Sequence, residues 1–367
     1  MSGVDYAPHR RARQGRARRA ISRGRERVVV ALYRGASALL VRVPLRLSEP
    51  AARWLFLVGY YLWPAKRRII EANAAHVLGL PAGHPDAADL ARAIYATYSR
   101  FALELMRLPG LPPDEPRRLL RSEGEHHERF MALWRRCQAE GRAVIAVSGH
   151  IGSIEVFAGA YAQQGIPTYG LADDSAFPEL FELLGRSRAR WGVTIIPWRR
   201  LRDIFRVMRR PCTLGMVVDW GYRPDDVSVR LFGDWTTLPA GPALLAARTG
   251  AVIVPVVARR DGEGRYGAAM YEPIEIADAS PAEVQRVTQA IAEALEDMVA
   301  EAPEQWYTFK PMWPTRPSES AALAARAART ASGSGVGRDA GERRGPGVES
   351  SRAGGTSEAG GGDEWRP

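Results

Sequence analysis

The chain changes its pattern of apolar positions near Gly141, from long helical periods to short apolar runs. Before this point, apolar residues recur at intervals of three and four, which predicts helices at 65–78, 86–108 and 116–140. Beyond it, short apolar runs predict strands, and the amphipathic stretches between them predict helices. We expect strands at 143–147, 168–171, 194–196, 214–218, 227–231, 252–257 and 266–274, and helices at 155–164, 178–191, 201–209, 240–249 and 281–301.

Strands that alternate with helices in this way imply an α/β fold, with a mixed, largely parallel central sheet flanked by helices on both faces. In such folds, catalytic and ligand-binding groups lie at the carboxyl ends of the strands. Polar residues that directly follow a predicted strand are therefore the first candidates for a functional site.

Two apolar stretches near the N-terminus, 28–43 and 54–63, are too short or too interrupted to span a membrane. The second begins at Trp54, ends at Trp63 and is followed by basic residues, a combination that suits the headgroup layer of an anionic membrane. Two ordinary core helices are the alternative interpretation. An arginine-rich tail beside these helices favours peripheral attachment of residues 28–64 to the cytoplasmic face of the cell membrane.

The two ends of the 367-residue chain differ from its body in composition. Residues 1–27 hold nine arginines and only two acids, so most of the net charge of +10 lies in a basic tail that we expect to be disordered. Residues 317–367 are rich in Gly, Ser and Ala, and we expect this tail to be disordered as well. The ordered body is then 28–316. It lacks nucleic-acid-binding motifs, so we predict no nucleic-acid partner.

Several common chemistries find no support in the sequence. Cys137 and Cys212 have no Cys/His cluster around them, so no metal site, disulfide framework or catalytic thiol is expected. The G-x-G-x-x-G match at 262–267 lies between two predicted strands, and we interpret 261–264 as a hairpin turn. Neither a G-x-S-x-G sequence nor a Walker A loop is present, which excludes the common serine-hydrolase and P-loop motifs.

The strongest candidate chemistry follows the predicted strand 143–147, in the sequence Ser-Gly-His-Ile-Gly-Ser-Ile-Glu. His150 would lie in a turn, to which Gly149 and Gly152 give backbone freedom, and Glu155 would lie in the first turn of the next helix. The two side chains can then converge, so that the carboxylate orients a neutral imidazole acting as a general base. Alternatively, both residues simply cap the start of a helix.

Three further residues are placed near the same edge of the sheet. Asp219 follows the predicted strand 214–218, and Asp234 follows the strand 227–231. Arg188, in the predicted helix 178–191, would place a guanidinium near developing negative charge. The alternatives are turn residues for the two aspartates and a solvated helix face for the arginine.

The ordered series of motifs resembles the lysophospholipid and lipid A acyltransferase superfamily, over approximately residues 55–314. Within it the chain looks most like the lipid A late acyltransferases and the phosphatidylinositol mannoside acyltransferases. The resemblance rests on His150 with Glu155, Arg188, Asp219, the Leu-Phe-Gly-Asp run that ends at Asp234, the Leu-Pro-Ala-Gly-Pro segment from Leu238, and the late Pro-Glu-Gln-Trp-Tyr segment 303–307.

The resemblance implies an O-acyltransferase that moves a fatty acyl group from acyl-CoA or an acyl carrier protein to a hydroxyl of a membrane glycolipid or phospholipid. It implies His150 as the general base and Glu155 as its orienting acid, while Asp234 takes the position of a second acid that approaches the histidine. A thioester is already activated, so neither a metal nor a cofactor is expected beyond the co-substrate.

Oxyanion or substrate contacts would then come from the backbone at Gly149 and Gly152, from Arg188 and from Asp219. Two other functions stay open at this point. One is a catalytically inactive lipid-binding or scaffold protein of the same fold, and the other is a lysophospholipid acyltransferase with a non-sugar acceptor.

Overall fold

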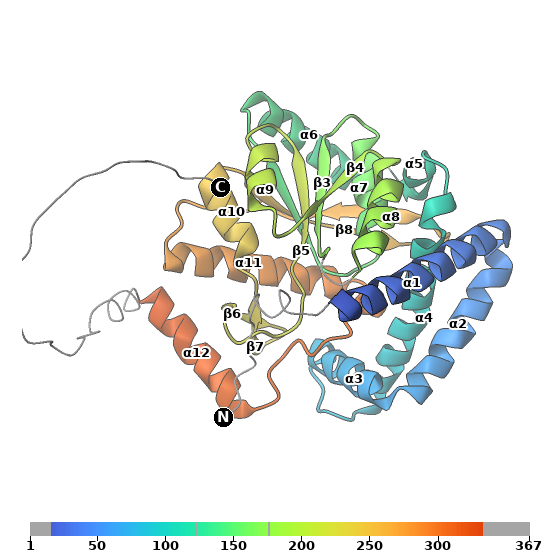
Figure 1. Cartoon of the computed structure of the whole chain (residues 1–367). Helices are drawn as coiled ribbons and strands as arrows, with labels where there is room; N and C mark the ends of the chain where they lie inside the picture. Colours follow the sequence, from blue (N-terminus) through green and yellow to red (C-terminus); the bar gives the residue numbers. More distant parts are fainter. Residues whose placement is uncertain (1–15, 122, 175–176, 333–367) are drawn as a thin grey trace, which may run out of the picture.

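The computed structural model describes residues 16–121, 123–174 and 177–332, and Figure 1 shows their arrangement. A seven-stranded sheet lies at the centre, with the strand order β1-β9-β8-β2-β5-β3-β4, and every pairing in it is parallel except that of β8 with β9. The expected α/β fold is confirmed. The strands are β1 (Leu120–Arg121), β2 (Val144–Ser148), β3 (Thr168–Ala172), β4 (Val193–Pro197), β5 (Thr213–Val217), β8 (Val252–Arg260) and β9 (Tyr266–Met270).

Helices cover both faces of this sheet, as the near-continuous apolar strands require. In β2, Val144 and Ala146 pack toward one face, against α6 (Glu125–Ala139) and α7 (Ile154–Ala162). Ile145 and Val147 pack toward the other face, where α9 (Leu201–Val207), α10 (Gly241–Thr249) and α11 (Pro281–Ala300) contribute the core. The central strands are therefore rigid and dry, and their carboxyl ends are fixed in position.

The N-terminal part forms a separate layer of helices beside the sheet (Figure 1). It consists of α1 (Arg16–Arg42), α2 (Leu45–Leu62), α3 (Pro64–Leu78) and α4 (Pro85–Arg107), and α4 packs against the other three. Within the described residues, no helix combines the length and the apolar character needed to cross a membrane. The expectation of a disordered tail is wrong for residues 16–27, which belong to α1, while residues 1–15 lie outside the described part.

The C-terminal tail also begins with structure that the composition did not predict. Residues 317–331 form α12 (Pro317–Ala331), which packs on a two-stranded hairpin of β6 (Val227–Leu231) and β7 (Asp234–Leu238). Leu323 and Ala327 are one helical turn apart and both are buried, and Arg326 donates to the backbone oxygen of Asp226. One apolar stripe thus suffices for docking, although average composition argued for disorder. Residues 333–367 lie outside the described part.

Two other predicted elements differ from the structure, and one predicted turn is confirmed. The strand 227–231 leaves the main sheet and pairs with β7, which was not predicted, through a tight turn at Phe232 and Gly233 with positive φ angles of 49° and 79°. The single helix predicted at 116–140 is divided into α5 (Glu115–Leu119), β1 and α6. The turn at 261–264 is confirmed, because β8 and β9 pair antiparallel on either side of it.

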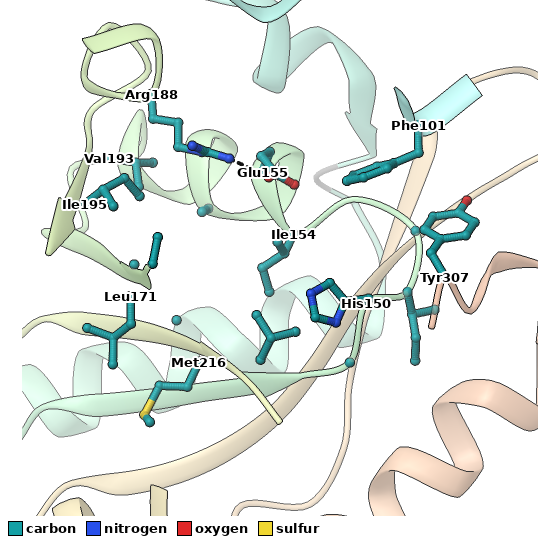
Figure 2. A pocket seen from close by; sticks show the side chains of 18 of the residues that line it. Phe101, His150, Ile154, Glu155, Leu171, Arg188, Val193, Ile195, Met216 and Tyr307 are labelled. Carbon is teal, nitrogen blue, oxygen red and sulfur yellow. Dashed lines mark hydrogen bonds and ion pairs between the residues drawn. The ribbon is translucent and has the colours of Figure 1, made fainter. Parts of the chain in front are cut away.

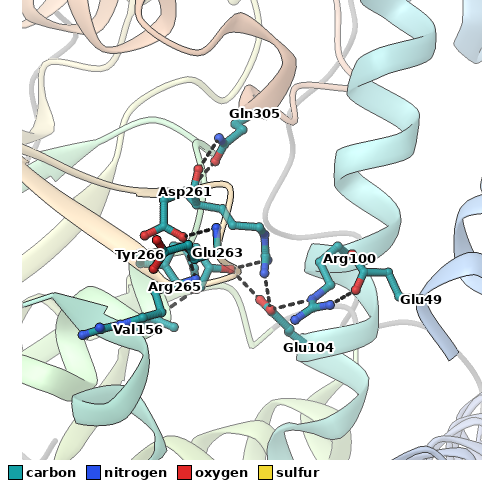
Figure 3. Close-up of polar contacts among 11 residues, drawn as sticks. Glu49, Arg100, Glu104, Val156, Asp261, Glu263, Arg265, Tyr266 and Gln305 are labelled. Atoms are coloured by element: carbon teal, nitrogen blue, oxygen red, sulfur yellow. Dashed lines mark hydrogen bonds and ion pairs between the residues drawn. The ribbon is translucent and has the colours of Figure 1, made fainter. Parts of the chain in front are cut away.

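A buried ionic cluster joins the N-terminal helices to the sheet (Figure 3). The carboxylate of Glu104, on α4, accepts hydrogen bonds from Arg260 Nη1 at 2.7 Å, from the Tyr266 hydroxyl at 2.5 Å and from Arg100 Nε at 3.0 Å. Burial by itself raises the pKa of Glu104, but Arg260 and its other donors outweigh burial and lower it. Gln305 exchanges two side-chain hydrogen bonds with the backbone of Arg260, so this cluster also fixes the segment that borders the functional site.

Candidate active site

The strand register brings His150 and Asp219 together. Strands β2 and β5 are parallel neighbours, and Ser148 is paired with Val217 at their carboxyl ends. His150 lies two residues beyond Ser148, and Asp219 lies two residues beyond Val217, so the two side chains emerge at the same level of the sheet edge. This is the edge at which α/β folds place their catalytic groups.

Asp219, itself buried, holds the half-exposed side chain of His150 through a short hydrogen bond. Its Oδ1 lies 2.7 Å from His150 Nδ1, and its Oδ2 accepts from the backbone N–H of His150 at 2.8 Å and from Trp306 Nε1 at 2.8 Å. Asp219 is only 1% exposed. Because an ionised carboxylate can only accept, Nδ1 carries the ring proton, and Nε2 of the neutral ring is left as the acceptor.

The two members of this pair shift each other's pKa in opposite directions. Burial is the largest single influence and lowers the pKa of His150, but the charge and hydrogen bond of Asp219, together with the charge of Glu155, outweigh it, and the pKa lies above its ordinary value of 6.5. For Asp219, burial raises the pKa, whereas the His150 ring and the Trp306 indole lower it more, so the carboxyl stays ionised. A histidine held in this way accepts a proton readily and passes it on, which is the behaviour of a general base and acid.

A strap at 305–307 fixes the turn that carries His150. Trp306 forms an antiparallel bridge with Ile151, the N–H of Gly152 donates to Gln305 O at 3.1 Å, and the N–H of Tyr307 donates to His150 O at 2.7 Å. Gly152 has a φ of 56°, and a Cβ there would lie 1.9 Å from the oxygen of Ala258, so only glycine fits.

The other glycine of the motif has a different task. A Cβ on Gly149 would lie 2.8 Å from Leu295 Cδ1 and 3.1 Å from Asp219 Oδ2, so its missing side chain lets the aspartate approach. Gly149 also lines the cavity beside His150. The N–H of Gly152, in contrast, already donates to Gln305 O. The structure therefore does not support the expectation that this N–H donates to an oxyanion.

The expected pairing of His150 with Glu155 is not formed. Glu155 lies in the first turn of α7, which Ser153 caps by accepting from Val156 N, and its Oε1 accepts from Arg188 Nη2 at 2.9 Å (Figure 2). Asp219 already occupies Nδ1 of the imidazole, so the orienting position is filled by a residue from another strand. Glu155 remains near enough to contribute to the raised pKa of His150.

Arg188 extends from the last turn of α8 (Pro178–Ala189) into the wall of the same cavity. Its guanidinium is bound to Glu155, and both side chains are mostly shielded from solvent. The oxygen Oε2 of Glu155 is buried without a hydrogen-bond partner in the described part of the chain, so the pair keeps one unused acceptor. The expectation that Arg188 contacts developing negative charge stays a prediction.

Asp234 does not join the site. It follows the hairpin turn at the start of β7, is 58% exposed and pairs with Nδ1 of His76 at 2.6 Å. The His76 ring in turn stacks on Trp313, with centroids 4.2 Å apart. The sequence placed Asp234 at the edge of the main sheet, but β6 and β7 form a hairpin of their own, and this carries the carboxylate to α3.

An apolar cavity of about 300 Å³ extends from His150 across the carboxyl ends of the strands (Figure 2). Its walls come mainly from α4, α7, β3, β4 and β5, and the polar side chains of His150, Glu155 and Arg188 lie among apolar ones. The labelled apolar residues of this wall are Phe101, Ile154, Leu171, Val193, Ile195, Met216 and Tyr307. A cavity of this kind suits a hydrocarbon chain with its reactive end at the histidine.

Sequence reasoning gave Asp219 only a substrate-contacting role and assigned none to Trp306. The signal for Asp219 was available, because it follows a predicted strand as closely as His150 does. Trp306 has no local signal, since it acts through a contact across 87 positions of the chain. The two cysteines, Cys137 and Cys212, are buried free thiols, and burial raises the pKa of Cys212 to about 12.

Comparison with known proteins agrees with this geometry. The family described as bacterial lipid A biosynthesis acyltransferase matches residues 22–315. A phosphatidylinositol mannoside acyltransferase of Mycolicibacterium smegmatis is 30% identical over 251 residues, which are 66% of this chain and 78% of that protein. Another of Mycobacterium tuberculosis (strain CDC 1551 / Oshkosh) is 28% identical over 284 residues, or 75% and 86% of the two chains.

The family match covers most of the described residues, including both His150 and the strap that holds it. The relatives carry the names of lipid acyltransferases, and the site offers an oriented histidine beside an apolar cavity. The chain therefore belongs to the bacterial lipid A biosynthesis acyltransferase family and is an O-acyltransferase of lipids.

Proposed function

We propose that the protein transfers a fatty acyl group from an acyl thioester, acyl-CoA or acyl carrier protein, to a hydroxyl of a membrane glycolipid, with His150 as the general base. The observation that carries the proposal is the His150–Asp219 pair, joined at 2.7 Å and placed at the end of an apolar cavity. The pair supplies the base, and the cavity supplies a place for the chain that is transferred.

The reaction needs one proton acceptor and no covalent enzyme intermediate. Nε2 of His150 takes the proton of the acceptor hydroxyl while its oxygen forms a bond to the thioester carbonyl carbon. The tetrahedral intermediate then expels the thiolate by breaking the C–S bond, and the imidazolium returns the proton to sulfur. Asp219 stabilises the imidazolium between these two steps, because its buried negative charge lies against Nδ1.

The acceptor is proposed to be a sugar hydroxyl of a glycolipid of the phosphatidylinositol mannoside type. Support comes from the names of two relatives that share 28–30% identity over most of their length. A sugar hydroxyl has a high pKa and gains much from a general base, whereas the thioester is already activated. The acceptor hydroxyl therefore needs the base that His150 supplies, and the thioester donor needs no further activating group.

The protein is proposed to act at the cytoplasmic surface of the cell membrane, attached peripherally through α2. Exposed apolar side chains lie within α2 and directly after it, at Trp54, Tyr61, Leu62 and Trp63, each at 60% or more. Lys66 follows at the start of α3. Exposed aromatic rings beside a cation favour the headgroup layer, where they would hold the enzyme next to its lipid acceptor.

Purified protein incubated with palmitoyl-CoA and phosphatidylinositol mannoside tests the proposal. Mass spectrometry should show acceptor heavier by one palmitoyl group, with one free thiol released per transfer. His150→Ala should reduce the rate by about 10²–10⁴-fold, because no other group replaces the base. His126→Ala, an exposed histidine on α6, is the matched control and should keep the wild-type rate. A rate for His150→Ala equal to that of the control would contradict the mechanism.

A further inference from the structure

A second cavity, open to solvent and of about 510 Å³, adjoins the catalytic histidine through Trp220. Trp220 lines both cavities, and its ring meets that of His150 edge to face, with centroids 5.4 Å apart. The first cavity is mostly apolar, whereas Lys310 and Arg223 line the second. A molecule bound in the second cavity would therefore be separated from His150 only by the Trp220 side chain.

Carboxylates lie near the two cations of this second cavity, Asp226 near Arg223 and Asp219 near Lys310, but in the described part of the chain neither cation is paired with one. Lys310 Nζ lies over the Trp220 ring, 5.2 Å from its centroid. In the described part of the chain, neither Lys310 nor Arg223 forms an ion pair, although most cations of the sheet domain do so. Glu319 also lines the cavity, but it is bound to Arg316. The chain has only two lysines, and the other, Lys66, donates to Phe309 O at 3.1 Å, next to Lys310.

Buried polar groups fix the backbone at both cations while leaving their charged ends free. Thr237 accepts from the N–H of Arg223 at 3.0 Å and donates to its oxygen at 2.8 Å. Asn73 donates to the oxygen of Lys310 at 2.8 Å. The N–H of Tyr222 donates to Pro311 O at 2.8 Å, which joins the two segments directly. The two cationic side chains therefore start from fixed positions on facing segments.

The close approach of these segments depends on Gly221. Its φ is 90°, and a Cβ there would lie 2.9 Å from Lys310 Cβ and 3.2 Å from Pro311 O. The cations consequently lie near one another, and they repel. Burial lowers the pKa of Lys310, Arg223 and Lys66 lower it further, and only Asp219 opposes them. An anion bound between the two cations would relieve this repulsion, because its negative charge attracts both of them.

We propose that Lys310 and Arg223 bind a phosphate group of a substrate and so hold that substrate with its reacting end at His150. The proposal rests on the acyl transfer proposed above. An arginine fork and a lysine ammonium together match the geometry and charge of a phosphate. Two substrates carry such a group, namely an acceptor with a phosphodiester and a donor with a phosphopantetheine arm. In both substrates a phosphate ester would bind in the second cavity while the reacting end of the same molecule lies at His150.

Direct binding tests the site without any catalysis. Full-length protein is titrated with inositol 1-phosphate and with inorganic pyrophosphate by calorimetry, at low and high salt. Lys310→Met and Arg223→Gln should each weaken the binding of one or both probes by about tenfold or more, since each removes a charge-assisted contact. Lys310→Arg should restore binding, and added salt should weaken it in the wild type. Arg206→Gln, at an exposed position of α9, is the matched control.

Failure to bind either probe in the wild type, or equal binding by both variants and the control, would overturn the proposal. Both outcomes are independent of acyl transfer, so they differ from a failure of the proposed function. Each variant should melt at the wild-type temperature, because both side chains are exposed. This measurement checks that the fold is retained.

Paired substrates then identify which molecule supplies the phosphate. If it is the donor, Lys310→Met should raise the KM for palmitoyl-CoA about tenfold or more and leave that for palmitoyl-N-acetylcysteamine, which has no phosphate, unchanged. If it is the acceptor, the same change should appear with phosphatidylinositol mannoside and be absent with octyl mannoside. A variant that alters kcat equally with all four substrates, with no change in KM, would contradict phosphate binding.

Discussion

Asp219 accepts two hydrogen bonds from His150, at Oδ1 from the ring nitrogen Nδ1 at 2.7 Å and at Oδ2 from the backbone N–H at 2.8 Å. The ring is thereby fixed relative to its own backbone as well as to the sheet. Trp306 adds a third donor to the carboxylate, so the buried charge is satisfied on both oxygens. The proposed base is thus oriented before any substrate arrives, which removes the cost of ordering it during the reaction.

Asp219→Asn should lower kcat by roughly 10²–10⁴-fold, because an amide neither fixes the productive tautomer nor stabilises the imidazolium. It should also move the acid limb of the rate profile. The wild-type base is active only when neutral, so activity rises as the pH passes upward through a pKa above 6.5. Burial is already the largest single influence on the pKa of His150. Without the carboxylate it is opposed by Glu155 and aided by Lys310, so the limb should move to lower pH.

Profiles of kcat/KM against pH for the two proteins measure this shift. An acid limb at the same or a higher pH in Asp219→Asn would show that Asp219 does not control the ionisation of His150.

Asp234→Asn should leave kcat and KM within about threefold of wild type, because its partner is His76 on α3 and not His150, the proposed base. The pair is largely exposed, so its loss should cost no more than about 1 kcal/mol of unfolding free energy. Steady-state kinetics and urea denaturation measure the two effects. A loss of activity as large as that of Asp219→Asn would instead support the catalytic role expected from the sequence.

Trp306→Phe keeps an aromatic ring but removes the indole N–H that bonds Asp219 Oδ2 at 2.8 Å. We expect a loss of about 1–3 kcal/mol in unfolding free energy, since a buried carboxylate oxygen loses a donor. We also expect kcat to fall while KM for the thioester stays the same, because the aspartate is less firmly held. Trp134→Phe, at a buried tryptophan on α6 that lines neither cavity, should lower stability alone.

Gly215→Val should shorten the acyl chain that the enzyme accepts. Gly215, on β5, lines the apolar cavity, and an added Cβ would meet Tyr169 O only at 3.6 Å, an ordinary contact. The new side chain then occupies space for about two methylene groups, each worth about 0.8 kcal/mol when buried, so kcat/KM for palmitoyl-CoA should fall more than tenfold relative to decanoyl-CoA. Gly267→Val, at an open position of β9, should leave this ratio unchanged.

Replacing Trp54 and Trp63 together by serine should weaken binding to anionic phospholipid vesicles by about tenfold or more. Both side chains are more than 60% exposed, Trp54 in the middle of α2 and Trp63 directly after it, so the fold should not suffer. Sedimentation with vesicles measures the bound fraction. Trp198→Ser, an exposed tryptophan beyond β4, serves as the control, and equal losses in both proteins would contradict attachment through α2.

Most of the secondary structure was predictable, because buried parallel strands need continuous apolar runs and amphipathic helices need apolar residues at intervals of three and four. The helix predicted at 281–301 is confirmed, with its stripe of Val284, Val287, Ile291, Leu295 and Val299 entirely buried. The errors fall where a segment depends on a distant partner. The helix α12 is one such case, since it is held by docking on β6 and β7 rather than by its average composition.

The sequence by itself determined that a histidine follows a buried strand, that glycines surround it and that Glu155 and Asp219 follow strands of the same sheet. It could not decide which acid reaches the imidazole, because spacing along the chain says nothing about contacts between neighbouring strands. The tertiary structure chose Asp219, 69 positions away, over Glu155, which is five positions away. The physical reason is the parallel pairing of β2 with β5, which sets the two strand ends level, while the start of α7 directs Glu155 toward Arg188.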